Sequence, residues 1–298
     1  MHTRQHPSGR FVVPFLASSP RQGPESAKRA RKPHAVDRDS PRTRPIDQGA
    51  HDPLVRRLGA NVELSPADIH ELEALAAMGR HCPAHTSLLH QYDVPECAIL
   101  VLDGFACRYK FLPNGGRQIT AYLLPGDIFE PELDFRLPLD CALGTLTACR
   151  LTFIPRSNYE GLISRRPRIA LALQIARLTE AARLREWIAN LGSRPGPERL
   201  AHLLCELLFR LRAAGLASEN QFGFPVTQAD LADTVGMSSV HINRVLQKLR
   251  RDGLIELSGR KVTIMKFDAL KALAEYDSSY LTPKVTPLRP VLGARPLT

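Results

Sequence analysis

The sequence lacks the features that would indicate a membrane protein, a secreted protein or one of the common enzyme classes. No apolar run approaches the ~18 residues of a membrane-spanning helix, although 44% of the 298 residues are hydrophobic. The six cysteines form no Cys-x-x-Cys pair and no segment resembles a secretory signal, which is typical of reduced thiols in a cytoplasm. No phosphate-binding loop, dinucleotide fingerprint or nucleophile elbow is present. We therefore expect a cytoplasmic protein with no catalytic residue, no cofactor and no membrane partner.

Acidic side chains are outnumbered, and the excess of positive charge is uneven. The net charge is +10, of which residues 1–50 contribute +6 through ten Lys/Arg and four Asp/Glu. Residues 1–52 also contain seven prolines and no apolar periodicity. We expect these residues to form a disordered basic extension, which either adds nonspecific affinity for DNA or is dispensable. The proline-containing tail, residues 282–298, is expected to be loose.

Residues 53–165 are predicted to form an N-terminal antiparallel β-roll with flanking helices. Residues 53–80 have leucines at helical spacing, and Ser65 followed by Pro66 is typical of a helix start. Farther along, Asn114-Gly115-Gly116 is a strong hairpin signal between two apolar runs. Short runs separated by turns at regular intervals predict a small antiparallel roll. The strands are expected over residues 98–102, 107–112, 118–124, 143–147 and 150–154.

Residues 166–192 are predicted to form one long amphipathic helix that pairs with its twin in a second copy. Its apolar residues recur at intervals of three and four and make one continuous stripe. Such a stripe can cover its own domain, but a helix this long between two domains more often forms a homodimer. The residues expected in this interface are Leu171, Ile175, Leu178, Ala181, Leu184, Ile188 and Leu191.

Residues 193–281 are predicted to form a C-terminal domain that follows a hinge. The hinge is expected at residues 191–197, which are rich in glycine and proline. An amphipathic helix over residues 198–214 should pack on the rest of this domain. A last short helix is expected over residues 268–276.

Within this domain the sequence predicts a winged helix-turn-helix. Thr227 is a good N-cap for the first helix, and Gly236 can take the positive φ that ends it. Ser238 caps the second helix, which should run to about Arg251 with Ile242, Val245, Leu246 and Leu249 on its inner face. Two short strands around a basic turn then form the wing.

The outer face of the second helix and the wing is predicted to bind DNA. Residues 236–266 hold seven Lys/Arg and two Asp/Glu, and a net charge of +5 attracts phosphates. A small helical domain with solvated charges would show part of this pattern, but the wing and the basic excess favour DNA. The residues expected to contact DNA are Thr227, Gln228, Ser238, Ser239, Val240, Asn243, Arg244, Gln247, Lys248, Arg260 and Lys261.

The order of roll, long helix, hinge and winged helix-turn-helix resembles the Crp/Fnr family of bacterial transcription regulators, over residues 53–281. The motifs that carry the resemblance are Pro125-Gly126-Asp127, residues 227–232 and 236–238, and Asn243-Arg244-Val245-Leu246. Residues 104–110, 185–192 and 239–244 further resemble a rhizobial-type subgroup of this family.

The resemblance implies an α+β chain whose roll is a cyclic-nucleotide-binding-like jelly roll. It also implies a homodimer that binds a two-fold symmetric site in double-stranded DNA, with RNA polymerase as a further partner and an effector domain that biases the DNA-binding domains. The family commonly contacts bases from three positions of the second helix, which here are Ser239, Val240 and Arg244.

The residues after the Pro-Gly-Asp turn depart from family members that bind cyclic AMP. Those members continue with a Gly-Glu pair and then Arg-Ser or Arg-Thr, whose arginine holds the cyclic phosphate. Here Asp140-Cys141 stands in place of Arg-Ser, and Pro131 removes an amide donor. The acidic residues of the segment outnumber Arg136; they are Glu130, Glu132, Asp134 and Asp140. We therefore expect a signal other than a cyclic nucleotide, and its identity stays open. Iron–sulfur members carry a cysteine cluster near the N-terminus, and residues 1–81 contain no cysteine.

Two other classes of protein share parts of this pattern. A cupin-like metal-binding β-barrel enzyme would have a similar roll, but it needs paired histidines on its strands, and residues 97–154 contain no histidine. An interaction module that has lost DNA binding is the second alternative, and the basic second helix argues against it.

The histidines and cysteines do not predict a metal site. His81, Cys82, His85 and His90 lie close together, but Pro83 interrupts them and surface histidines are the simpler expectation. Three cysteines in predicted strands are expected to be small core residues, although a redox role for one is an alternative; they are Cys107, Cys141 and Cys149.

Overall fold

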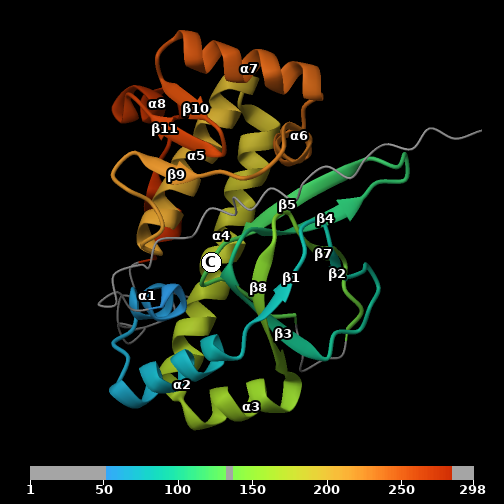
Figure 1. Ribbon diagram of the computed structural model, residues 1–298, viewed down its shortest axis with the longest axis vertical. Coiled ribbons are helices and arrows are strands. Elements are labelled where there is room, and N and C mark those ends of the chain that lie inside the picture. The colour runs from blue at the N-terminus through green and yellow to red at the C-terminus, as the bar shows by residue number, and fades with distance from the viewer. Residues whose placement is uncertain (1–51, 132–136, 284–298) are drawn as a thin grey trace, which may run out of the picture. The chain divides into compact units, whose positions relative to one another are not determined.

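The computed structural model describes residues 52–131 and 137–283, and Figure 1 labels its helices and strands. The chain begins with two short helices, α1 (Pro53–Gly59) and α2 (Pro66–Ala77). Ser65 caps α2 as predicted, because its hydroxyl accepts the backbone N–H of Asp68 at 3.2 Å. The extension expected over residues 1–52 lies outside the described residues except for Asp52, and so does the tail beyond Pro283.

The roll consists of two four-stranded antiparallel sheets, with strand orders β1-β8-β3-β6 and β2-β7-β4-β5. The strands are β1 (Arg80–Cys82), β2 (Ser87–Leu89), β3 (Cys97–Asp103), β4 (Ala106–Phe111), β5 (Arg117–Leu123), β6 (Ile128–Phe129), β7 (Ala142–Thr145) and β8 (Cys149–Pro155). The five predicted strands correspond to β3, β4, β5, β7 and β8. The sequence did not reveal β1, β2 and β6, because strands of two or three residues are too short to show an alternation.

The predicted turn at Pro125-Gly126-Asp127 packs directly against α1. The backbone N–H of Asp127 donates to the carbonyl of Leu124 at 2.8 Å, and Gly126 has a φ of +89°. A Cβ at Gly126 would lie 2.7 Å from the carbonyl oxygen of Pro53. Glycine is therefore required here both by the backbone conformation and by the close approach of α1.

Two helices follow the roll, α3 (Arg156–Arg165) and α4 (Pro167–Ser193). The hinge predicted at residues 191–197 is wrong in most of its length: α4 continues through Gly192, and α5 (Gly196–Ala213) begins after only Arg194 and Pro195. Pro197 lies in the first turn of α5, where a helix does not need its missing N–H. Within the described ranges, no helix combines the length and the apolar character that crossing a membrane requires.

The C-terminal domain is a winged helix-turn-helix, as predicted. It comprises β9 (Gln221–Gly223), α6 (Gln228–Val235), α7 (Ser239–Arg251), β10 (Ile255–Ser258), β11 (Lys261–Ile264), α8 (Phe267–Ala274) and the 3-10 helix η2 (Ser278–Leu281). The predicted wing strands pair in antiparallel register, and β9, which the sequence analysis did not predict, adds a third strand beside β11.

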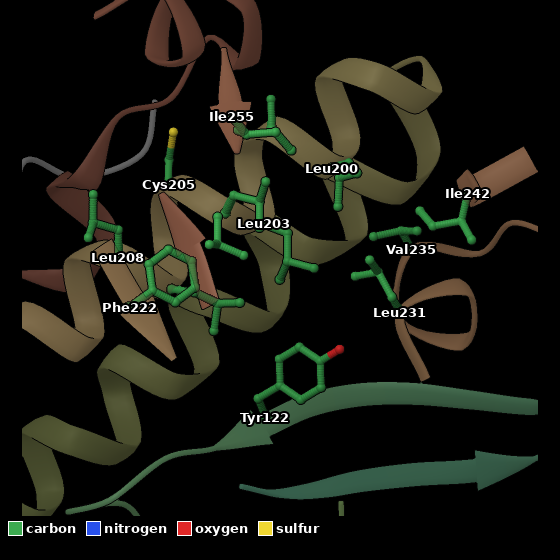
Figure 2. Close-up of a cluster of buried hydrophobic side chains, with 14 of the residues drawn as sticks. Tyr122, Leu200, Leu203, Cys205, Leu208, Phe222, Leu231, Val235, Ile242 and Ile255 are labelled. Atoms are coloured by element: carbon green, nitrogen blue, oxygen red, sulfur yellow. The ribbon is translucent and has the colours of Figure 1, made fainter. Parts of the chain in front are cut away.

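One hydrophobic cluster joins this domain to the roll (Figure 2). It contains Leu203 of α5, Val235 of α6 and Ile242 of α7, all of them buried, so α5 packs on the helix-turn-helix as expected. Tyr122 of β5 belongs to the same cluster, is fully buried, and meets the Trp187 ring of α4 edge to face at 6.0 Å. The roll, the long helix and the winged helix-turn-helix are thus packed through shared apolar side chains.

Candidate nucleic-acid interface and internal cavities

The second helix of the helix-turn-helix, α7, buries one face and exposes the other. Ser238 caps it, since its hydroxyl accepts the N–H of His241 at 3.2 Å. Ile242, Val245 and Leu249 are buried, which confirms the predicted inner face. All the residues expected to contact DNA are exposed: Thr227, Gln228, Ser238, Ser239, Val240, Asn243, Arg244, Gln247, Lys248, Arg260 and Lys261.

The start of α6 is held beside α7 by polar contacts. The hydroxyl of Thr227 accepts the N–H of Asp230 at 3.0 Å, and the Asp230 carboxylate accepts the N–H of Thr227 at 3.1 Å, so the predicted cap forms a capping box. The amide of Asn243 donates to the side-chain oxygen of Gln228 at 3.3 Å. Gly236 takes a φ of +63° and ends α6, as the sequence predicts.

The cations on this face differ in how far they are already neutralised. Lys248 forms an exposed ion pair with Asp252 at 2.9 Å. Within the described ranges, Arg244, Arg260 and Lys261 make no ion pair. Their charges are therefore available to an anionic ligand, whereas Lys248 would first have to leave a weak surface pair.

The apolar stripe of α4 is only partly exposed. Leu171, Leu178 and Ile188 are 48%, 62% and 71% exposed. Ile175 is buried inside its own chain, and Ala181, Leu184 and Leu191 are partly buried. One side of α4 thus covers the roll, and a separate line of large apolar residues faces solvent.

A cavity of about 570 Å³ lies between the roll and α4. Its walls include Phe129 and Leu139 from the roll and Leu173 and Leu184 from α4. Pro131 and Asp140, which the sequence analysis singled out, also line it, whereas Glu132, Asp134 and Arg136 lie outside the described residues. The charged residues on its wall are Arg57, Arg108, Arg177, Glu130, Glu180 and Asp140.

Each arginine of this first cavity is paired with a carboxylate. Arg108 contacts Glu180 at 2.5 Å, Arg177 contacts Glu130 at 3.0 Å, and Arg57 contacts the buried Asp127. These arginines lie outside the loop that follows the turn and were not predicted, because they come from β4, α4 and α1. Local sequence carries no signal that would bring them together. Among the described residues, the lining of the first cavity is accordingly balanced in charge rather than acidic.

Three cysteines of the roll, Cys107, Cys141 and Cys149, are buried, as expected of core residues. Burial raises the pKa of Cys107 to about 12 and those of Cys141 and Cys149 to about 11, so all three thiols are protonated near neutral pH. In residues 52–131 and 137–283, no group of three or more His, Cys, Asp or Glu side chains is arranged to hold a metal ion.

Comparison with known proteins matches both halves of this arrangement. Residues 79–166 match the cyclic nucleotide-binding domain, and residues 198–273 match the Crp-like helix-turn-helix domain. The chain is 30% identical over 224 residues to the transcriptional activatory protein AadR of Rhodopseudomonas palustris, which covers 73% of this chain and 91% of that protein.

The chain belongs to the Crp/Fnr family of transcription regulators. It is also 28% identical over 213 residues to the nitrogen fixation regulation protein FixK of Bradyrhizobium diazoefficiens, across 70% of this chain and 88% of that one. The crystal structure of FixK2 from Bradyrhizobium japonicum superposes with a TM-score of 0.59 at 24% identity, covering 65% of this chain and 96% of that chain. The predicted family and fold class are confirmed.

In this Crp/Fnr protein, the start of β5 is hydrogen-bonded directly to the first helix of the helix-turn-helix. Arg117 donates to the carboxylates of Asp230 at 2.5 Å and Asp233 at 2.8 Å. Farther along β5, the hydroxyl of Tyr122 lies 2.6 Å from that of Thr234. Asp230, which the sequence identifies only as a capping residue, therefore also joins the DNA-binding domain to the roll.

Asp230 is ionised in this contact. Burial alone would raise its pKa, but hydrogen bonds from Thr227 and Arg117 outweigh burial and hold the pKa below the ordinary 3.8. A carboxyl group whose pKa is lowered on folding stabilises the fold above its unfolded pKa and loses that contribution as the pH falls.

We predict that Arg117→Ala lowers the free energy of unfolding by about 3 kcal/mol at neutral pH, because it leaves the nearly buried Asp230 carboxylate without its cation. The difference in unfolding free energy between wild type and variant should shrink as the pH falls below about 4, where Asp230 becomes protonated in the unfolded chain. Urea denaturation at neutral and acidic pH measures both quantities.

Lys110→Ala is the matched control, since Lys110 lies on the same β4–β5 hairpin as Arg117. Its ion-pair partner, at 3.0 Å, is the exposed Asp140. Its loss should cost less than about 1 kcal/mol. Equal costs for the two variants, or a cost of Arg117→Ala that does not change with pH, would contradict the prediction.

Proposed function

We propose that this Crp/Fnr protein is a cytoplasmic, non-enzymatic transcription regulator that acts as a homodimer on a two-fold symmetric DNA site. RNA polymerase is a further proposed partner, and the proposed signal is not a cyclic nucleotide. The observation that carries the DNA-binding part is the exposed face of α7. It presents Val240 and Arg244, which makes no ion pair within the described ranges, while Ile242 and Leu249 are buried.

The side chains on this face suggest how bases would be contacted. Val240 and Arg244 are four residues apart on a helix and therefore share a face. Arginine can pair with O6 and N7 of guanine, whereas valine offers only an apolar contact such as a thymine methyl. Arg260 and Lys261, in the wing, are proposed to contact the DNA phosphates.

We expect Arg244→Ala to reduce the affinity for the preferred DNA site by about 1–3 kcal/mol per half-site and to relax the preference at one base pair in each half. Lys261→Ala is the matched control: it should weaken binding to all sequences about equally and flatten the dependence on salt. Selection from random duplexes with wild type and both variants measures this. Identical motifs from wild type and Arg244→Ala would rule out Arg244 as a base contact.

The homodimer proposal rests on the exposed line of Leu171, Leu178 and Ile188 along α4. Large apolar side chains repeated along one helix face are a self-complementary surface, which a second copy can cover through a two-fold axis. The remaining residues of the predicted stripe would support this interface from within the chain rather than contact the second copy.

We predict that Leu178→Asp shifts the protein from dimer to monomer at micromolar concentration, because it would bury an unpaired charge in the interface. Met78→Asp is the control, since Met78 is 56% exposed but lies at the end of α2. Sedimentation velocity measures the outcome. A wild-type monomer at that concentration would disprove the proposed dimer.

The signal proposal rests on the first cavity. Its arginines are each held by a carboxylate, so a cyclic phosphate entering it would have to displace Glu130 or Glu180 from an existing ion pair. Pro131 and Pro138 on the same wall lack the backbone N–H that could bind phosphate oxygens. A neutral or zwitterionic ligand suits this balanced lining better than an anion.

Calorimetry with cyclic AMP and cyclic GMP should therefore give no saturable heat at millimolar nucleotide. Saturable binding with micromolar affinity would show that the first cavity accepts a cyclic phosphate. Glu130→Gln provides a second test: if charge pairing is what excludes the phosphate, releasing Arg177 should increase any residual binding of the nucleotide.

A further inference from the structure

A second cavity, of about 360 Å³, lies on the other side of the Pro125-Gly126-Asp127 turn. Its walls come from α1, the turn, α4, α5 and the end of η2. Much of the lining is apolar and includes Ala172, Ala176, Phe209 and Ala213. Its charged side chains are Arg57, Asp127, Arg183 and Arg210, so it differs from the first cavity in having more cations than carboxylates.

Two of these arginines already have buried partners. Arg57 contacts one oxygen of Asp127, and Arg210 donates to the other at 2.7 Å. Arg210 also donates to the Tyr122 carbonyl at 3.0 Å and lies 3.4 Å from Glu206. Asp127 and Glu206 thus account for the charges of Arg57 and Arg210.

Arg183 is the third arginine of this cavity, and it forms no ion pair with Asp127 or Glu206. It is only 3% exposed, and its one hydrogen bond within the described part of the chain is a long one, 3.4 Å to Glu180. Glu180 already makes a 2.5 Å contact with Arg108, and Nε of Arg183 has no hydrogen-bond partner among the described residues. Because Nε of this buried guanidinium is unused and its ion pair with Glu180 is long and shared, a further anion would stabilise it.

The electrostatics of the site agree with this geometry. Burial, together with the nearby charge of Arg210, lowers the pKa of Arg183 to about 10, although the carboxylates of Asp127, Glu180 and Glu206 act in the opposite direction.

We propose that the second cavity binds a small amphipathic monocarboxylate, with its carboxylate on the guanidinium of Arg183 and its apolar chain against Ala172, Ala176 and Ala213. Among the described residues, Arg183 shares its one ion-pair partner, Glu180, with Arg108, so a ligand with one negative charge would complete its compensation. The planar guanidinium can pair with a carboxylate through two parallel hydrogen bonds. The alanine side chains on the wall leave room for a hydrocarbon chain.

This proposal concerns binding and does not depend on how the protein contacts DNA. Because Phe209 and Arg210 belong to α5 whereas Pro125 and Asp127 belong to the roll, a ligand here would touch both parts. An effect of the ligand on DNA affinity would rest on the proposed function. Ligand binding and DNA affinity are therefore measured separately.

Calorimetry with butanoate, hexanoate and octanoate tests the binding. We expect saturable binding of the acids, with an affinity that increases with the length of the hydrocarbon chain. Octanol should bind at least roughly tenfold more weakly than octanoate, because octanol lacks the charge. Absence of saturable binding for all three acids, or equal binding of octanol and octanoate, would overturn the proposal without any variant.

Arg183→Gln should weaken octanoate binding by roughly ten- to a hundredfold, since a hydrogen bond to a charged group is lost. Arg168→Gln, at an exposed position near the start of the same helix, should leave binding unchanged. Thermal unfolding without ligand separates binding from a structural role. Arg183→Gln should melt close to wild type, because the attraction lost to Glu180 and Asp127 is offset by removing a buried charge.

Octanoate should raise the melting temperature of wild type and Arg168→Gln but not that of Arg183→Gln. An Arg183→Gln variant that melts well below wild type without ligand, or that binds octanoate as wild type does, would contradict the assignment of Arg183. DNA affinity with and without octanoate then reports separately on any coupling to the helix-turn-helix.

Discussion

The carboxylate of Asp127, buried between Arg57 of α1 and Arg210 of α5, is the interaction on which the arrangement of the chain depends. Burial would raise its pKa, but the charges of Arg57, Arg210 and Arg183 outweigh burial and lower it, so the group is ionised. Removing one partner of such a pair leaves an uncompensated charge and typically costs about 3–5 kcal/mol. The turn of the roll, the first helix and α5 therefore all meet at this one carboxylate, while the hydrophobic cluster and Arg117 join the roll to the helix-turn-helix.

The same carboxylate separates two cavities of different character. Among the described residues, arginines and carboxylates balance along the wall of the first cavity. In the second cavity, Arg183 shares its carboxylate partner, Glu180, with Arg108. Arg57 lines both cavities and contacts Asp127. A ligand in either cavity would therefore act on the Arg57–Asp127 ion pair. A ligand that binds more tightly to one arrangement of this pair would couple its cavity to α5 through Asp127.

Much of the DNA-binding domain could be predicted from local sequence. Thr227, Gly236 and Ser238 mark helix ends because capping and positive φ are decided within a few residues of the chain. The exposed and buried faces of α7 follow from helical periodicity, which is why the exposure of Arg244 and the burial of Ile242 were both anticipated. The Gly126 turn was found for the same reason, since its φ of +89° is a local requirement.

By itself, then, the sequence determined the helix boundaries of the winged helix-turn-helix, the main strands of the roll and the exposed basic face. Tertiary structure alone decided which cations meet which carboxylates. Asp230 was predicted as a cap, but its pairing with Arg117 joins residues more than a hundred positions apart. The apolar stripe of α4 likewise did not show that Ile175 faces the chain's own core while Leu178 faces solvent. Periodicity and capping depend on neighbours along the chain, whereas ion pairing and cavity lining depend on side chains that only folding brings together.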